Sequence, residues 1–194
     1  MPLVLARIDC RLIHGQVVET WVPHLNANSL VVANDDLAAN AFLRSVMELA
    51  VPRGVAVRFC RLSEAAAAVA EADRNGERSI LLVSSAADAV ALRQGGVRFD
   101  LLNIGNLHFA AGKVEISPSV FFSPEDFEAV RWFRRHGVSV CVRGTPFEAG
   151  TPHQAGGGGG GVVLPVAPSA LLRGWWYPHR SGAGQVILLR PPAV

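Results

Sequence analysis

The chain of 194 residues is long enough for one domain with a short appendage, and 50% of its residues are hydrophobic. That composition supports a sizeable core without metals or disulfides. The formal net charge of +2 gives no electrostatic argument for nucleic-acid binding. The three cysteines, Cys10, Cys60 and Cys141, form no CxxC pair, and an odd count argues against a disulfide framework, which favours a reducing cytoplasm. We expect neither a signal peptide nor a membrane span, because no apolar run is long enough.

Strand and helix patterns alternate along the first 142 residues. The expected strands cover 3–9, 29–34, 55–60, 79–84, 99–104 and 138–142, with short edge strands at 113–117 and 120–122. The expected helices cover 16–25, 36–50, 63–72, 86–93 and 124–136. Such repeated strand–helix units predict an α/β fold, in which helices cover both faces of a mostly parallel central sheet of six to seven strands.

Several helix boundaries have local signals. Pro23 should kink or end the first helix early. Asp36 is expected to cap the second, whose apolar side chains should face inward: Phe42, Leu43, Val46 and Met47. Ser123 begins the last helix, and Gly137 suits the left-handed conformation that ends it.

The alternation stops after residue 146. We expect the α/β domain to cover 1–146, a glycine-rich linker to cover 147–161, and a poorly ordered extension to cover 162–194. The glycines at 156–161 are too uniform for a phosphate-binding loop. Trp175, Trp176 and Tyr177 either dock on the core or a partner or belong to a poorly ordered appendage, and the last is our prediction.

Polar side chains gather where the first strand ends. The stretch "ARIDCRLIHGQ" places Arg7, Asp9, Arg11 and His14 before a helix, at the edge of an α/β sheet where ligands bind. A neutral imidazole is a good nucleophile near pH 7. In front of a helix, a phosphoryl group on His14 would meet free backbone N–H groups, and Gly15 would let that backbone approach closely.

The charged neighbours have matching roles in this interpretation. Arg11 would bind phosphate oxygens, and Asp9 would either orient Arg11 or accept a proton from the other imidazole nitrogen. The alternative is an ordinary turn histidine with solvated arginines beside it, and spacing alone does not reject that alternative. No metal site is expected, because Cys10, His14 and His24 lack a zinc-ligand spacing.

The segment "RIDCRLIHGQVVETW" resembles the phosphorylation-site signature of the mannose/sorbose-type IIB component of the bacterial sugar phosphotransferase system (PTS), whose usual form is RIDDRLIHGQV. The resemblance covers residues 3–146 and continues through "VVANDDLAANAFLRSVMELAVPRGVAVRF", "LLNIGNLHFAAGKVEIS" and "EDFEAVRWFRRHGVSVCVRGTP". Cys10 departs from it, because it stands where the signature has a second aspartate.

This resemblance implies a function. The histidine at the position of His14 would take a phosphoryl group from a phosphohistidine of a IIA component and pass it to a sugar held by the membrane IIC/IID pair. The arginine at the position of Arg11 would stabilise that group. No metal or nucleotide cofactor is implied, and a homodimer is compatible with the sequence.

The full predicted site has two groups of residues. The catalytic group is His14, Arg11 and Asp9, and phosphate or substrate binding is assigned to Gly15, Arg7, Asp35, Asn103 and Gly105. Three roles are open for Asp35: it contacts the transferred group, it orders the first loop, or it only caps its helix. His108 either joins Asn103 and Gly105 in a far pocket wall or is structural, and we favour the structural role.

Two other functions compete with this prediction. One is a regulatory binding module whose phosphorylated state a partner recognises without sugar transfer; Cys10 and the extension motivate it. The other is a doubly wound small-ligand domain that uses Asp35 and Asn103.

Overall fold

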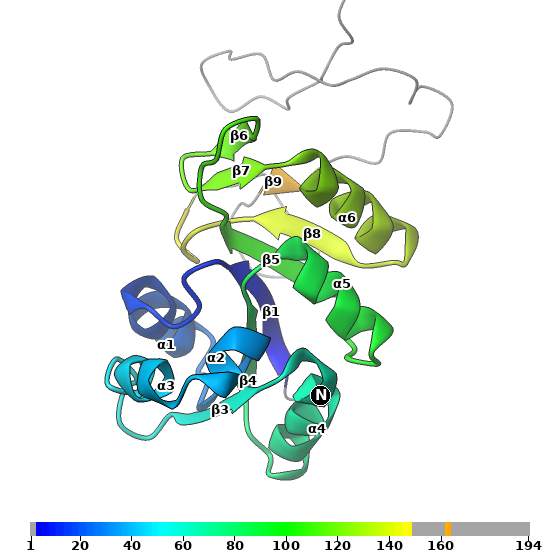
Figure 1. The fold of residues 1–194 in the computed structure, drawn as a ribbon. Coiled ribbons are helices and arrows are strands. Elements are labelled where there is room, and N and C mark those ends of the chain that lie inside the picture. The colour runs from blue at the N-terminus through cyan, green and yellow to red at the C-terminus, as the bar shows by residue number, and fades with distance from the viewer. Residues whose placement is uncertain (1–2, 149–161, 164–194) are drawn as a thin grey trace, which may run out of the picture.

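The computed structural model describes residues 3–148 and 162–163. One seven-stranded sheet has the order β3-β2-β4-β1-β5-β8-β9, and a separate two-stranded sheet pairs β6 with β7 (Figure 1). The strands are β1 (Leu3–Asp9), β2 (Ser29–Ala33), β3 (Ala56–Cys60), β4 (Ser79–Val83), β5 (Leu101–Asn106), β6 (Val114–Ser117), β7 (Val120–Phe122), β8 (Ser139–Val142) and β9 (Val162–Val163). The six strands from β3 to β8 in that order pair in parallel, which confirms the predicted fold class.

Helical segments connect the parallel strands. They are η1 (Gln16–Trp21), α1 (Val22–His24), α2 (Asp35–Ala39), α3 (Ala41–Glu48), η2 (Leu62–Glu64), α4 (Ala65–Arg74), α5 (Ala86–Gln94) and α6 (Pro124–Arg135). The segment η1 is a π-helix and η2 a 3₁₀-helix. As predicted, Ser123 caps α6 through its side chain, and Gly137 follows the helix with φ +76°. Among the helices of the described residues, none is long and apolar enough to cross a membrane.

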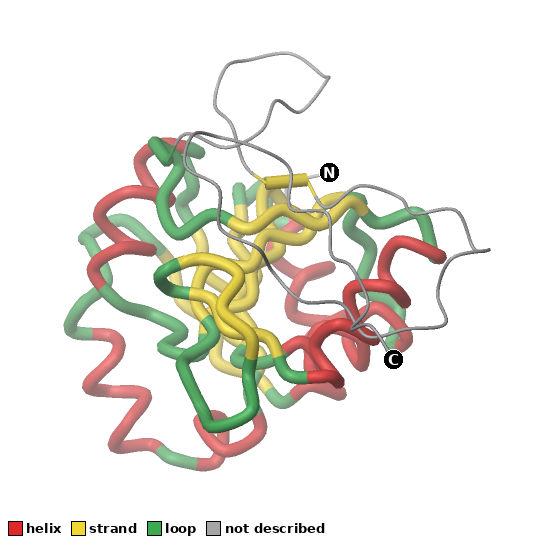
Figure 2. The backbone as a smooth tube through the Cα atoms, turned by 90° about the horizontal axis from the view of Figure 1, so that it is seen from above, coloured by secondary structure: helices red, strands yellow, loops and turns green. Residues whose placement is uncertain are grey.

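Two hydrophobic clusters lie on opposite faces of the sheet, and Figure 2 shows helices on either side of the strands. One cluster joins the strands to α4, α5 and α6 through residues such as Ala72, Leu92 and Phe133. The other joins them to η1, α1 and α2 through residues such as Val17 and Leu37. Strand side chains alternate between the faces, so β1 contributes to both clusters.

The single helix expected over 36–50 is two helices. Asn34, and not Asp36, caps α2, and its side chain accepts a hydrogen bond from the Leu37 N–H. Asn40 interrupts the helix with an extended backbone and caps α3 by accepting from the Leu43 N–H. This break redirects the chain.

The inward orientation predicted for the second helix is therefore wrong for three of its four apolar residues. Phe42, Leu43 and Val46 are exposed to 75%, 45% and 47%. Met47 alone of the four packs against the η1–α1–α2 cluster.

The later part of the chain also differs in detail from the prediction. The two short strands β6 and β7 form their own antiparallel hairpin and do not edge the main sheet. Val162–Val163, at the start of the predicted extension, pairs antiparallel with β8 as the edge strand β9. The predicted linker and extension otherwise lie at 149–161 and 164–194, outside the described residues.

Candidate active site

The loop after β1 turns sharply before the first helix. Leu12 has a φ of +56°, and its N–H donates to the Asp9 carbonyl at 2.9 Å. The His14 carbonyl then accepts from the N–H groups of Val17 and Val18 at 2.9 and 3.1 Å, which starts the helical run. The first N–H groups of a helix have no intrahelical acceptor, and His14 lies directly before such a helix start.

Asp9 is the central acceptor of this loop. Its fully buried carboxylate receives the Arg7 Nη2 at 2.8 Å and the His14 Nε2 at 2.9 Å on Oδ2, and the Arg11 backbone N–H at 3.1 Å on Oδ1. Burial alone would raise the pKa of Asp9. The hydrogen bond from His14 and the positive charge of Arg7 outweigh burial, so the pKa of Asp9 lies below its ordinary value. Asp9 is therefore ionised and can only accept.

This ionisation fixes the tautomer of His14. Because the carboxylate has no proton to donate, the 2.9 Å contact requires the proton on Nε2. In the neutral form of the ring, the lone pair is then on Nδ1. The side chain is 16% exposed, so the ring lies at the surface of the loop and not in the core. Of the two roles that the sequence left open for Asp9, the structure shows both the imidazole contact and a weaker 3.7 Å contact with Arg11 Nε.

Arg7 binds the Asp9 carboxylate from the buried side of the loop. It is fully buried, and its guanidinium donates to Asn103 Oδ1, to the Arg143 carbonyl at 3.0 Å and to the Gly144 carbonyl at 3.0 Å. The indole of Trp21 lies 5.4 Å from its Cζ. Burial lowers the pKa of Arg7, and Asp9 counteracts part of that effect. Arg7 thus supports Asp9 and is too deep to meet a ligand phosphate directly.

Gly105 makes room for this guanidinium. The register of β1 and β5 pairs Arg7 with Asn103, so Gly105, two residues on, faces the same side of the sheet. A Cβ atom at Gly105 would lie 1.9 Å from Arg7 Cζ. Asn103 and Gly105 were predicted as a pocket wall; the structure places them around Arg7.

Arg11 is the accessible cation of the loop. Its side chain is 50% exposed, and its Nη2 donates to Gln16 Oε1 at 3.0 Å. Together Arg7, Asp9 and Arg11 leave one net positive charge beside His14. The Cys10 Sγ lies 2.8 Å from Asn106 Oδ1.

The other predicted residues make no hydrogen bond with Asp9 or His14 that the structure shows. Asp35 Oδ1 accepts from the Leu62 N–H at 2.8 Å, so it ties the start of α2 to the loop after β3. Gly15 has helical angles, φ −47° and ψ −45°, so no unusual conformation requires glycine there. His108 is exposed. Within 3–148 and 162–163, no group of three His, Cys, Asp or Glu side chains could hold a metal ion.

The loop after β8 also contributes to this site, although the sequence patterns did not predict it. The Gly144 carbonyl accepts from both Arg7 and the Trp21 Nε1, the latter at 2.9 Å. Glu148 accepts from the backbone N–H groups of Gly144 and Thr145 at 2.8 and 3.0 Å, which fixes the loop. The available signal was the "RGTP" motif, because it follows a parallel strand and so lies at the same sheet edge as His14.

The site therefore consists of a loop histidine with a buried arginine–aspartate pair behind it. It lies at the carboxyl edge of a parallel sheet, where α/β proteins bind ligands. Residues 3–155 match the family described as "PTS system sorbose subfamily IIB component". The chain is 39% identical over 150 residues to an N-acetylgalactosamine-specific phosphotransferase enzyme IIB component of Escherichia coli, which covers 76% of this chain and 94% of that protein. It is 32% identical over 143 residues to a sorbose-specific EIIB component of Klebsiella pneumoniae, with coverage of 74% and 87%.

Solved structures of IIB components have the same fold as this chain. A PTS-dependent N-acetylgalactosamine IIB component from Streptococcus pyogenes superposes with a TM-score of 0.70 at 32% identity, over 74% of this chain and 88% of that one. The chain therefore belongs to the sorbose subfamily of PTS IIB components, as the signature around His14 predicted.

Proposed function

We propose that this chain is a phosphocarrier. His14 accepts a phosphoryl group from a phosphohistidine of a IIA component and donates it to a sugar at a membrane IIC/IID pair. The observation that carries the proposal is the 2.9 Å contact of His14 Nε2 with ionised Asp9, because it leaves the lone pair on Nδ1. The new P–N bond forms at Nδ1 as the P–N bond of the donor breaks.

The surrounding charges suit such a transfer. A phosphoryl group in transit carries negative charge that positioned cations stabilise. Arg11 is exposed enough to meet it, whereas buried Arg7 acts through Asp9 as a positioning residue. Asp9 also stabilises positive charge on the imidazole as the new bond forms. Three free cysteines fit a cytoplasmic location, where thiols stay reduced.

The direct test is phosphotransfer from a purified, labelled IIA component. We expect the unaltered chain and His108→Ala to take up label, and His14→Ala to take up none. His108 is the matched control because it is also a loop histidine near this sheet edge. The unfolding temperature of His14→Ala should equal that of the unaltered chain, which shows that the variant is folded. If this folded variant takes up label, the proposal is contradicted.

The modified nitrogen provides a sharper test. Alkaline digestion followed by chromatography separates the two phosphohistidine isomers. We expect the Nδ1 isomer, and finding the Nε2 isomer would contradict the tautomer argument even if His14 is the modified residue. A second arm adds membrane vesicles that contain the IIC/IID pair, where sugar should discharge the label.

A further inference from the structure

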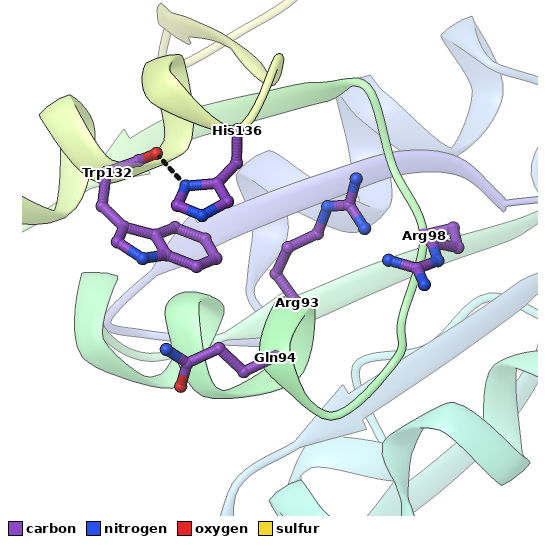
Figure 3. Close-up of a pocket in the computed structure, with 5 residues that line it drawn as sticks. All are labelled: Arg93, Gln94, Arg98, Trp132 and His136. Atoms are coloured by element: carbon purple, nitrogen blue, oxygen red, sulfur yellow. Dashed lines mark hydrogen bonds between the residues drawn. The ribbon is translucent and has the colours of Figure 1, made fainter.

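A hollow lies at the edge of the sheet opposite to the one that carries His14. It has a volume of about 390 Å³ and is lined by Arg93, Gln94, Arg98, Trp132 and His136 (Figure 3). These residues come from the last turn of α5, the connection to β5 and the end of α6. Since that connection leads into the start of a parallel strand, the hollow lies at the amino edge of the sheet. His14 lies at the carboxyl edge, so the two sites are separate.

The lining is cationic and includes no carboxylate. In the part of the chain that the structure describes, the Nε of Arg93 is buried without a hydrogen-bond partner. Over the same residues, the Arg93 guanidinium lies over the Phe99 ring at 5.8 Å, and neither Arg93 nor Arg98 forms an ion pair. Two neighbouring arginines without a neutralising acid favour a bound anion.

Helix ends explain only part of this charge. Arg93 lies in the last turn of α5 and His136 is the C-cap of α6, where positive charge is favourable. The carbonyls of both last turns already accept backbone N–H groups: Leu92 from Val97 at 3.0 Å and Phe133 from Val138 at 2.9 Å. These two carbonyls therefore have backbone donors and do not need the arginine side chains as caps.

One wall of the hollow is aromatic. The rings of Trp132 and His136 stack with centroids 4.0 Å apart and planes 24° apart. The His136 Nδ1 lies 2.8 Å from the Trp132 carbonyl, which can only accept, so Nδ1 carries a proton and the ring is held in place. Figure 3 shows the Arg93 guanidinium beside this stacked pair. A planar ring that packs on the wall would place an attached anionic group near the arginines.

We propose that this hollow binds a nucleoside phosphate, with Arg93 and Arg98 facing the phosphate groups and the Trp132–His136 pair packing against the base. The volume lies within the usual range of about 300–1,000 Å³ for small-molecule sites. Guanidinium groups bind phosphate in bidentate geometry, and bases stack on aromatic side chains. This site is independent of the phosphocarrier function proposed for His14.

The test is calorimetric titration of the full chain with ADP, inorganic pyrophosphate and adenosine. We expect ADP to bind more tightly than pyrophosphate, and adenosine to bind too weakly to detect. The double variant Arg93→Gln/Arg98→Gln should weaken ADP binding by about tenfold or more, because it removes two charge-assisted contacts. The matched control Arg53→Gln/Arg74→Gln changes two exposed arginines elsewhere and should bind as the unaltered chain does.

Two further measurements separate the explanations. His14→Ala should bind ADP normally, because its site is at the other sheet edge; loss of binding there would overturn the proposed location. In the unaltered chain, stacking should move the adenine proton resonances upfield through the ring currents of the aromatic wall. Three results would each overturn the assignment. The first is that ADP does not bind, and the second is that the Arg93/Arg98 variant binds ADP as tightly as the unaltered chain. The third is that ADP binds no more tightly than pyrophosphate and its adenine resonances do not move upfield.

Discussion

Gly105→Ala is the substitution whose effect the structure specifies best. The added Cβ would lie 1.9 Å from Arg7 Cζ and Nη2 and 2.3 Å from Nη1. Ordinary contacts between such atoms are about 3.5–4.0 Å, so the guanidinium must move by roughly 1.5 Å or more. That movement breaks the buried contact of Arg7 with Asp9 and the hydrogen bond from Arg7 to the Gly144 carbonyl.

The expected cost follows from what is broken. Disrupting a buried ion pair destabilises a protein by about 3–5 kcal/mol, and overpacking alone costs about 1–3 kcal/mol. Because both effects arise from one displacement, we expect a loss of about 3–5 kcal/mol in the free energy of unfolding. Phosphorylation of His14 should also slow, since Asp9 would lose the partner that holds it.

Gly15→Ala is the matched control. Its Cβ would meet Glu19 Oε1 at an ordinary 3.6 Å, and the backbone is already helical. We expect no loss of stability, or a gain of up to about 1 kcal/mol. Urea unfolding of both variants measures the difference. If Gly105→Ala unfolds within about 0.5 kcal/mol of the unaltered chain, the size of a typical surface substitution, the packing argument around Arg7 is refuted.

Three smaller predictions concern other contacts. The Arg58 hydrogen bonds lower the pKa of Glu77 from 4.5 to about 2, so the pair stabilises the fold fully above pH 4.5 and this is lost as the pH falls toward 2. The unfolding temperature of Glu77→Gln should therefore lie below that of the unaltered chain at pH 7 and converge with it near pH 2; a pH-independent difference would contradict this. Trp21→Phe removes the donor to the Gly144 carbonyl but keeps a ring, so urea unfolding should show a loss of about 1 kcal/mol, whereas a stability equal to that of the unaltered chain would show that this bond contributes nothing. Cys10→Asp should still take up label from IIA, because the thiol contacts Asn106 and not His14; a variant that stays unlabelled would count against this.

The sequence determined the features that depend on near neighbours in the chain. The alternation of apolar residues identified β1, and the Ser123 cap with Gly137 bounded α6, because those signals act within a few residues. The polar loop from Arg7 to His14 was visible for the same reason. Its position at the carboxyl edge of the sheet followed from the parallel strand–helix order.

Tertiary structure decided which side chains meet. The register of β1 with β5 placed Asn103 and Gly105 around Arg7, and the loop after β8 supplied the Gly144 carbonyl. The Asn40 cap turned the apolar side of α3 outward, against the prediction that Phe42 is buried. The contacts around Arg7 depend on the path of segments distant in sequence, whereas the Asn40 cap acts over three residues. Local patterns record burial and turn preference, but they contain no information about which distant strand or loop lies alongside.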